Sequence, residues 1–313
     1  MPNGFRYEVD TNKLAEICLA AYDAYERSVG IFKNGREKFL PQFNLPEEVE
    51  SCLQSNPVQA ANYLFLSASM EKRIQTQTNI KNGLRVWAQR DKKWIFNPVE
   101  VSRRNFSEME QICVQDFRYV VNGFAKSYYH NSIKMAEVYG GDPRRIIQNQ
   151  TAEEARKRLT LFSGIGNPIA NLITLYYMER GIVSPTDPKN ALLKVDVHKA
   201  RIPLNMGCVN IGDEEQIRVD LLVPLLEKSY WEICKKNNLN PVVLDTLLWI
   251  IGSEICSMKN YFACDENCPI ENSCISNVPY SQETGKFVVF KNGKRVETRR
   301  NIRLKDQLLM SFQ

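Results

Sequence analysis

The sequence lacks any long apolar run: no uncharged stretch approaches the roughly eighteen residues that a membrane-spanning helix needs. Its first residues, MPNGFRYEVDTNKL, lack the apolar core of a secretion signal. Internal repeats and low-complexity segments are also missing. We therefore expect a soluble intracellular monomer with no membrane partner, cytoplasmic and nucleoid-associated if its source is prokaryotic.

The composition is that of a globular protein, with 43% hydrophobic and 25% charged residues among 313. Its net charge of +5 is concentrated at the C-terminal end. Residues 276–313 contain eight basic and three acidic residues, whereas residues 1–275 contain 33 of each. Such a tail could hold a polyanion such as nucleic acid, or it could simply be a solvated, loosely ordered tail.

Helical periodicity dominates the chain, and clear β signals are scarce. The segments predicted to be helical are 11–30, 57–89, 107–129, 131–140, 143–148, 151–162, 168–179, 197–207, 214–237 and 241–256. Two of them are expected to begin with a capping box, formed by Ser107 with Glu110 and by Thr151 with Glu154. Near the end, KFVVF and KRVETRR flank Asn292-Gly293, the strongest short hairpin signal. The predicted fold is all-α with a small β-hairpin tail.

Nine cysteines are present, and they divide into two groups. Five lie among apolar neighbours and are interpreted as buried thiols: Cys18, Cys52, Cys113, Cys208 and Cys234. The other four cluster in CSMKNYFACDENCPIENSC as Cys256, Cys264, Cys268 and Cys274. Four thiolates this close can hold a four-iron cluster or zinc. The irregular spacing and the absence of a CxxC pair favour the 4Fe-4S cluster, with zinc or four free thiols as alternatives.

Residues 159–177, LTLFSGIGNPIANLITLYY, predict two helices joined by a tight turn. The first ends near Phe162, the turn is Gly164-Ile165-Gly166, and the second begins at Asn167 or Pro168. Exposed amides at a helix N-terminus bind phosphate oxygens well, so this hairpin could grip a nucleic-acid backbone. The alternative is an ordinary turn between two helices.

Asp196, in LLKVDVHKARIPLNMG, lies where the next helix is expected to begin. Aspartate is a good N-cap residue, and capping alone would explain it. A carboxylate fixed at a helix N-terminus also stays ionised, and it can stabilise the positive charge that forms on a sugar when a base departs. The two roles are compatible.

Three motifs in order, GIGNPIAN, VDVHKARI and the four-cysteine loop, resemble the iron–sulfur branch of the helix-hairpin-helix DNA glycosylase superfamily, which includes endonuclease III and the adenine-mismatch glycosylase. The resemblance covers roughly residues 60–275. It implies two helical domains with the active site in the cleft between them. These would be residues 1–56 with 189–275, and residues 57–188, followed by the basic hairpin tail, 276–313.

The same resemblance assigns roles to individual residues. Asp196 would be the catalytic aspartate, and Gly164, Ile165, Gly166 and Asn167 would bind the backbone of duplex DNA. The four clustered cysteines would hold the 4Fe-4S cofactor. The target base would be flipped out of the helix to reach Asp196.

Departures from the family pattern refine this expectation. Pro168 occupies the position at which strand-cutting members carry a lysine, and proline cannot form the sugar Schiff base. We therefore expect a monofunctional glycosylase. The first two cysteine gaps are each one residue longer than usual. The strand-inserting glutamine has no clear match, although Gln75 or Gln77 could replace it.

The base pocket is the least defined part of the prediction. Glu71, Gln75, Tyr128 and His130 are candidates because a flipped base needs aromatic stacking and hydrogen bonds to its edge; each could instead be an ordinary surface or core residue. Two other functions stay open. One is a non-catalytic iron–sulfur protein that binds nucleic acid, and the other is a glycosidase acting on RNA or a modified nucleoside.

Overall fold

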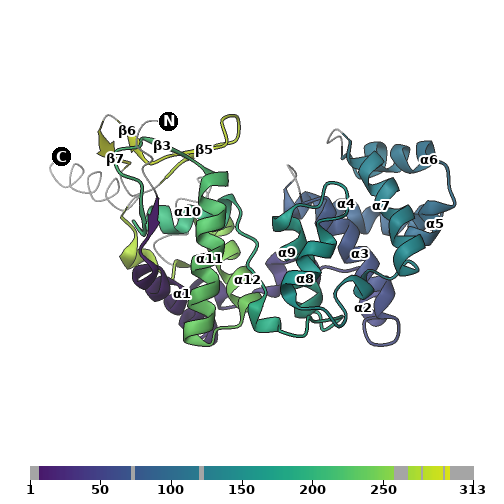
Figure 1. Cartoon of the computed structure of the whole chain (residues 1–313), viewed down its shortest axis with the longest axis horizontal. Coiled ribbons are helices and arrows are strands. Elements are labelled where there is room, and N and C mark those ends of the chain that lie inside the picture. The colour runs from purple at the N-terminus through teal and green to yellow at the C-terminus, as the bar shows by residue number, and fades with distance from the viewer. Residues whose placement is uncertain are drawn as a thin grey trace, which may run out of the picture. The chain divides into compact units, whose positions relative to one another are not determined.

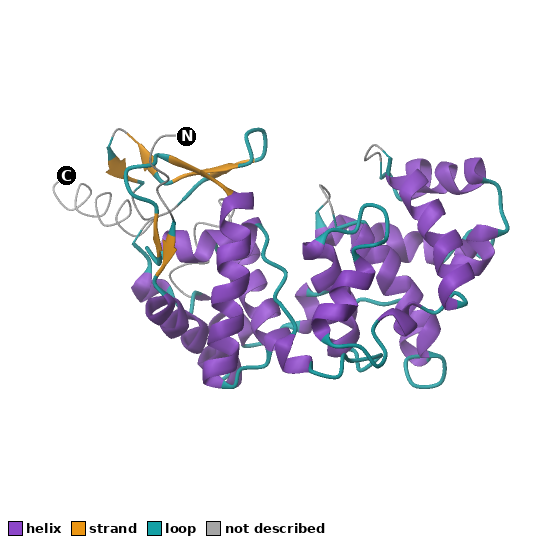
Figure 2. Ribbon diagram, viewed as in Figure 1, coloured by secondary structure: helices purple, strands orange, loops and turns teal. Residues whose placement is uncertain are grey.

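The computed structural model describes residues 7–71, 75–119, 123–256, 267–275, 278–291 and 293–296. Within these ranges the protein is predominantly helical, with twelve α-helices and three small sheets (Figure 2). This confirms the helical character that the sequence predicts. None of the described helices is long and apolar enough to cross a bilayer.

The chain forms two compact units. Figure 1 labels their helices and colours the chain by residue number from the N-terminus to the C-terminus. Unit 1 comprises Met1–Arg36 and Leu192–Gln313, and unit 2 comprises Glu37–Ala191. The first boundary between the units follows Arg36, whereas the sequence predicted it after residue 56. The reason is that α2 (Glu47–Ser51) packs against α3 (Pro57–Ser69) through the fully buried Val49, which belongs to the core of unit 2.

Unit 2 is built around two helices that are buried on nearly all sides. They are α3 and α9 (Asn167–Glu179), and the hydroxyl of Tyr177 on α9 donates to the carbonyl oxygen of Ala61 on α3 over 2.7 Å. The other helices are α4 (Thr76–Trp87), α5 (Pro98–Ser102), α6 (Phe106–Gln111), α7 (Phe124–Tyr139) and α8 (Ala152–Leu159).

Two long helices predicted in unit 2 are wrong in their extent. Residues 57–89 form two helices and not one: α3 ends at Ser69, and α4 begins at Thr76. Residues 107–129 contain α6, a π-helical turn over Ile112–Asp116, and the start of α7. Helix α7 begins after Gly123, whose φ of 79° is in the left-handed region that interrupts a helix.

Helix capping was predicted correctly at one site and wrongly at another. Thr151 and Glu154 form the expected capping box of α8. At α6, by contrast, the cap is Asn105, whose side chain accepts from the amide of Ser107; the predicted pairing of Ser107 with Glu110 does not start this helix.

The described part of unit 1 contains four α-helices that pack around shared apolar faces. They are α1 (Thr11–Glu26), α10 (Val197–Asn205), α11 (Val219–Asn237) and α12 (Pro241–Ile250), which a π-helical turn, Ile251–Ile255, extends. Helix α1 packs on α11 and α12, and so does α10. Of the five cysteines predicted to be buried, four are; Cys52 is half-buried.

Three small antiparallel sheets lie in unit 1. The pairs are β1 (Glu8–Val9) with β2 (Val209–Asn210), β5 (Lys286–Val288) with both β3 (Gln216–Arg218) and β4 (Tyr280–Ser281), and β6 (Phe290–Lys291) with β7 (Lys294–Arg295). The last pair forms the predicted hairpin in part: Phe290 and Lys291 pair across the turn, whereas Lys286–Val288 of the predicted strand KFVVF pair with β3 and β4 instead.

The β3 strand changes two expectations about the C-terminal part of the chain. The predicted helix 214–237 begins only at Val219, because residues 216–218 form β3. Pairing of β3 with β5 then ties the described part of residues 276–313 to the helical body of unit 1. This segment is therefore not a separate appendage.

Candidate active site

Asp196 caps the N-terminus of α10, as its sequence position predicts. Its Oδ1 atom accepts hydrogen bonds from the amides of His198 and Lys199, at 3.0 and 3.2 Å. The carboxylate is 19% exposed, so it is held in place and still reachable from solvent. One oxygen is thus committed to the helix, and the other, Oδ2, points away from it.

Lys194 is the nearest cation to this second oxygen. Its Nζ lies 3.4 Å from Oδ2 of Asp196, and its side chain is 11% exposed. Burial alone would raise the pKa of Asp196, but the charges of Lys194, Lys199 and His198 and the amide of Lys199 outweigh it. The pKa of Asp196 therefore lies well below its ordinary value, and the carboxylate is ionised at neutral pH.

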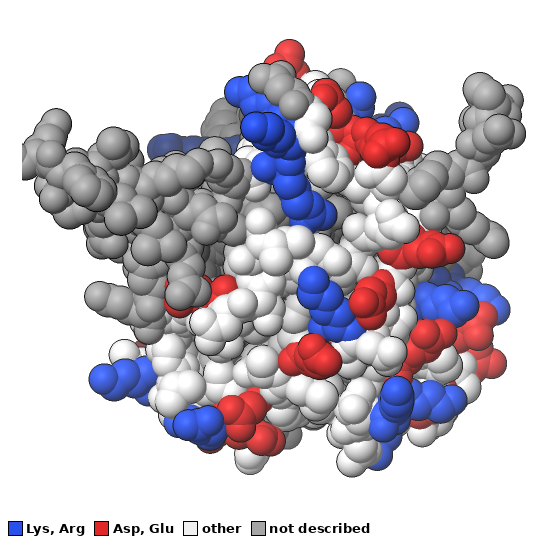
Figure 3. All heavy atoms as spheres, turned by 90° about the vertical axis from the view of Figure 1, so that its left-hand side faces the viewer, with Lys and Arg blue, Asp and Glu red and all other residues white. Residues whose placement is uncertain are grey.

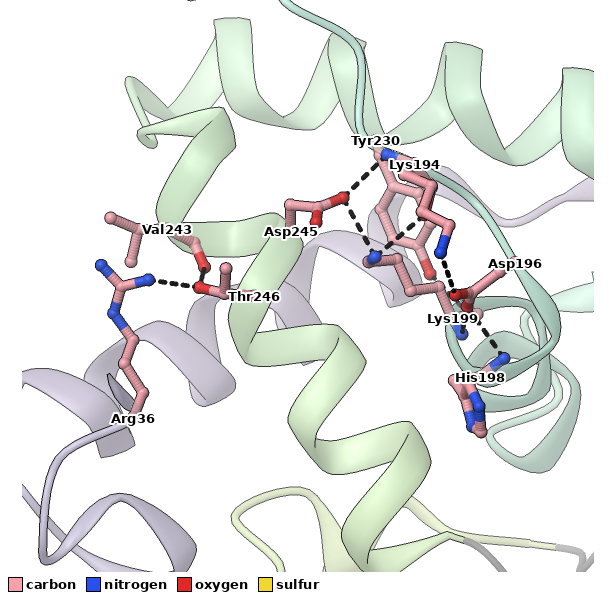
Figure 4. A network of polar contacts seen from close by, with 9 residues as sticks. All are labelled: Arg36, Lys194, Asp196, His198, Lys199, Tyr230, Val243, Asp245 and Thr246. Carbon is pink, nitrogen blue, oxygen red and sulfur yellow. Dashed lines mark hydrogen bonds and ion pairs between the residues drawn. The ribbon is translucent and has the colours of Figure 1, made fainter. Parts of the chain in front are cut away.

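Lys199, whose amide binds Asp196, forms a buried ion pair with Asp245 (Figure 4). Nζ of Lys199, a residue that is 1% exposed, is 3.1 Å from Oδ1 of Asp245 on α12. The same Nζ donates to the carbonyl oxygen of Lys194 at 2.9 Å, and the amide of Lys194 donates to Oδ1 of Asp245 at 2.7 Å. The sequence interpretation did not include Asp245, although a lone charge within PVVLDTLLWII signals a buried partner.

Pro203 lies inside α10, a position that is unfavourable because proline has no amide hydrogen. The carbonyl group left without a helical donor is that of Lys199. The hydroxyl of Tyr230, a fully buried residue of α11, donates to this carbonyl oxygen over 3.2 Å. Tyr230 thereby compensates for the proline and fixes α10 against α11.

His198, the next polar residue of α10, is a structural neighbour of Asp196. Its ring packs edge-on against Trp249 with centroids 6.2 Å apart, and its Nδ1 atom is buried without a hydrogen-bond partner among the described residues. Burial lowers the pKa of His198 despite the opposing effect of Asp196. Gly252 packs directly on its backbone: a Cβ atom there would lie 2.4 Å from the carbonyl oxygen of His198.

The cysteine segment begins and ends beside α10. Cys256 follows the π-helical turn, and its carbonyl oxygen accepts from Nη1 of Arg201 at 3.2 Å. At the other end, the amide of Ile275, next to Cys274, donates to the carbonyl oxygen of Asn205 at 3.0 Å. Arg201 and Asn205 are four residues apart, so α10 holds both ends of the segment near one face.

The structure describes three of the four predicted cluster ligands. Cys268 and Cys274 flank a short 3-10 turn over Glu271–Ser273, and Cys264 lies outside the described residues. Among the described residues alone, no three Cys, His, Asp or Glu side chains form a metal-binding group. A segment closed at both ends on α10 and bearing thiols fits an iron–sulfur cluster in its donor chemistry.

The predicted hairpin of unit 2 is present as α8, a turn, and α9. Gly164 has a φ of 74°, which favours glycine. Ile165 is buried, with 4% of its surface exposed to solvent. Gly166 is the N-cap of α9, and the first helical donors are the amides of residues 169 and 170. The exposed residues Gly166 and Asn167 therefore precede those donors, which is the geometry of an anion site.

Helix α7 holds this hairpin turn, a role that the sequence interpretation missed. Asn131, which is 5% exposed, donates to the carbonyl oxygen of Ser163 and accepts from its amide, each at 2.8 Å. Nζ of Lys134 donates to the carbonyl oxygen of Leu161 at 3.0 Å and lies 5.0 Å from the ring centre of Phe162. The turn is thus fixed before any ligand binds.

A small cavity of about 110 Å³ lies beside the hairpin within unit 2. Its lining residues are Ser69, Tyr119, Gly123, Phe124, Ser127, Tyr128, Asn131, Ser163, Gly164 and Ile165. Of the four predicted base-pocket residues, Tyr128 alone lines it, and the Tyr128 hydroxyl donates to the carbonyl oxygen of Ile95 at 2.7 Å.

The other three predicted pocket residues lie elsewhere. His130 and Gln75 are exposed. The carboxylate of Glu71 accepts from Oγ1 of Thr76 at 2.9 Å and from Nδ2 of Asn79 at 3.1 Å, and so secures the start of α4. These contacts give Glu71 a structural role.

Charge on unit 1 is mixed in sign. On the face drawn in Figure 3, basic and acidic side chains are interspersed over the lower part, and a run of basic side chains lies near the top. The amides of Val289 and Phe290 both donate to the carbonyl oxygen of Glu215, which follows Asp213 and Glu214. The described part of the basic C-terminal segment therefore lies next to an acidic one.

The chain matches no protein-family model, and no curated protein matches it. The resemblance to the helix-hairpin-helix glycosylases therefore stays a prediction from three sequence motifs. For two of these motifs the structure describes the local geometry, which is a capped carboxylate and a glycine turn before a helix N-terminus.

Proposed function

We propose that this protein is a DNA N-glycosylase that removes a damaged, mismatched or modified base from duplex DNA. The observation that carries the proposal is the state of Asp196. Its carboxylate is fixed by two amides, partly exposed, and kept ionised by two neighbouring lysines. A carboxylate that is fixed, ionised and still partly exposed can act on a substrate while it caps the helix.

Cleavage of the bond between base and sugar leaves positive charge on the sugar ring. In the proposed reaction Oδ2 of Asp196 stabilises this charge or orients the attacking water, while Oδ1 stays bonded to the helix amides. Because the carboxylate is already oriented, little reorganisation is required as the charge develops. The base must leave the duplex to reach such a carboxylate.

The hairpin supplies the proposed contact to the DNA backbone. The amides of Gly166 and Asn167 would donate to phosphate oxygens, and the dipole of α9 would favour the negative charge. Contacts of this kind position the duplex without reading its sequence. Recognition of the target base then depends on residues of the pocket.

Pro168 supports a monofunctional reaction. It lies in the first turn of α9, close to the proposed phosphate contacts, and it carries no amine. The covalent sugar imine that precedes strand cleavage cannot form at this position. The expected product is an intact strand with an abasic site.

A 4Fe-4S cluster would be held by Cys256, Cys264, Cys268 and Cys274. When bound, it would cross-link the segment that begins and ends beside α10. In this proposal the chain's own residues carry the chemistry, and the cluster stabilises the end of unit 1 that supports Asp196.

Anaerobic incubation with a panel of duplexes, each carrying one modified or mismatched base, tests the proposal. Each product is divided into alkali-treated and untreated halves and separated on a denaturing gel. Strand breaks that need alkali and are lost in Asp196→Asn are expected. Breaks without alkali would contradict the argument from Pro168. Tight binding without any product would favour a non-catalytic protein, and cleavage of RNA or nucleosides alone would favour the other alternative.

A further inference from the structure

We propose that Lys199 and Asp245 are positioning residues for the reaction, because together they hold the peptide of Lys194 and, through it, the carboxylate of Asp196. This inference rests on the function proposed above. It concerns how the site keeps its geometry and identifies two residues that do not themselves touch the substrate.

The contacts of the pair form a closed ring with the backbone of Lys194. Oδ1 of Asp245 accepts from the amide of Lys194 at 2.7 Å and lies 3.1 Å from Nζ of Lys199. That Nζ also donates to the carbonyl oxygen of Lys194 at 2.9 Å. Both sides of one residue's backbone are therefore fixed by the ion pair.

Lys199 forms hydrogen bonds with both Lys194 and Asp196, the first and last residues of the segment 194–196. Its main-chain amide donates to Oδ1 of Asp196, and its side chain donates to the carbonyl oxygen of Lys194 (Figure 4). A shift of Lys199 would displace the carboxylate and its nearest cation together. This arrangement couples the position of Asp196 to the buried pair.

Stability alone is a poor explanation for this pair. Lys199 and Asp245 are 1% and 5% exposed, and Asp245 lies in an otherwise apolar helix. Burying two charges costs solvation energy, and a well-packed apolar pair of similar volume often stabilises a fold as well. The pair does what an apolar pair cannot, since it provides an acceptor and a donor for the backbone of Lys194.

The test compares two charge-free double variants. Lys199→Met with Asp245→Leu removes both clamping contacts and fills the space with apolar side chains. Lys199→Met with Asp245→Asn is equally uncharged but restores an acceptor for the amide of Lys194. A matched control, Lys92→Met with Asp116→Leu, removes a half-buried ion pair of unit 2 whose Nζ–Oδ1 distance is 2.7 Å.

Single-turnover base release and duplex affinity are measured for each variant, with circular dichroism to verify folding. The Met/Leu variant should release base about 100-fold more slowly than wild type, since small displacements of a catalytic group have effects of this size. Its duplex affinity should stay within about twofold, because the phosphate contacts lie in unit 2. The Met/Asn variant should recover about tenfold of the lost rate, and the control should match wild type.

The outcomes separate this inference from the proposed function. A folded Met/Leu variant that releases base at the wild-type rate would overturn the inference alone. Equal losses in the Met/Leu and Met/Asn variants would also overturn it, because the acceptor for Lys194 would then be irrelevant. Absence of base release by the wild-type protein would refute the proposed function and the inference with it.

Discussion

At the scale of single residues, the two oxygens of Asp196 have different partners, which would let this residue combine a structural role with the proposed chemical one. Oδ1 is bonded to amides of α10, and Oδ2 faces the ammonium group of Lys194. The sequence predicted the cap correctly, and the catalytic role of the carboxylate stays a prediction. Lys194 lies two residues before Asp196 in the sequence, but only the structure shows that its side chain faces the carboxylate.

The pH dependence of protein stability should report on Lys194. Lys194, Lys199 and His198 face Asp196 and lower its pKa below the unfolded value of about 3.9. Ionisation of Asp196 therefore stabilises the fold above that unfolded pKa, and this contribution is lost as pH falls through the folded pKa. Lys194→Met should raise the folded pKa of Asp196, so the acid limb of the stability profile should lie at a higher pH in the variant than in wild type.

The free energy of unfolding, measured by denaturant titration across the acid range, tests this prediction. Lys228→Met is the matched control, because Lys228 forms an exposed ion pair with Glu232 in the same unit. The control profile should coincide with that of wild type. An acid limb that does not move in Lys194→Met would show that Lys194 does not set the ionisation of Asp196.

At the scale of elements, the hairpin depends on α7. Asn131→Ala removes two hydrogen bonds to the backbone of Ser163 and leaves that peptide unpaired. The free energy of unfolding should fall by about 1–3 kcal/mol. Duplex affinity should fall as well, while the rate of base release by saturating protein should change little. Denaturant titration and duplex binding measure the two effects, and unaltered affinity in the folded variant would contradict the account.

The contact between α10 and the turn before Cys256 depends on Gly252. In Gly252→Ala the new Cβ would lie 2.4 Å from the carbonyl oxygen of His198, so the two elements must separate. We expect a loss of about 1–3 kcal/mol in the free energy of unfolding, as for other overpacked sites, together with slower base release. Gly285→Ala, whose Cβ meets no atom within 4 Å but keeps a positive φ, provides a comparison. Wild-type stability in Gly252→Ala would refute the close contact.

Local patterns predicted elements well where local chemistry decides the structure. The capping box at Thr151, the start of α9 near Pro168 and the hairpin around Asn292-Gly293 each depend on neighbouring residues. Strand β3 and the Lys199–Asp245 pair depend on partners 46 or more positions away in the sequence. Periodicity cannot reveal such pairings, which is why residues 214–218 were predicted as helix.

At the scale of the whole molecule, unit 1 is assembled from both ends of the chain, since α1 packs on α11 and α12. The resemblance likewise predicts one domain that joins an N-terminal segment to a C-terminal one, with the second domain inserted between them. Its first boundary was wrong because Leu45, Val49 and Leu53 are apolar residues of the unit 2 core, and nothing in their local sequence specifies which core they join.

The proposed 4Fe-4S cluster is tested by analysis of the intact protein. Anaerobically purified protein should contain about four iron and four acid-labile sulfide per chain. Cys268→Ser should lose both and unfold more readily, whereas Cys52→Ser, at a half-buried cysteine of unit 2, should retain them. Stoichiometric zinc in place of iron would contradict the cluster.

Direct detection of the released base tests the central claim most directly. Mass spectrometry of the small-molecule fraction, after incubation with a duplex carrying one modified base, reports the bond that is broken. Wild-type protein should release the free base, and Asp196→Asn should bind the duplex while releasing it at least about 1,000-fold more slowly. Asparagine retains the cap, so the variant should fold. Equal release by the folded Asp196→Asn variant would contradict the account.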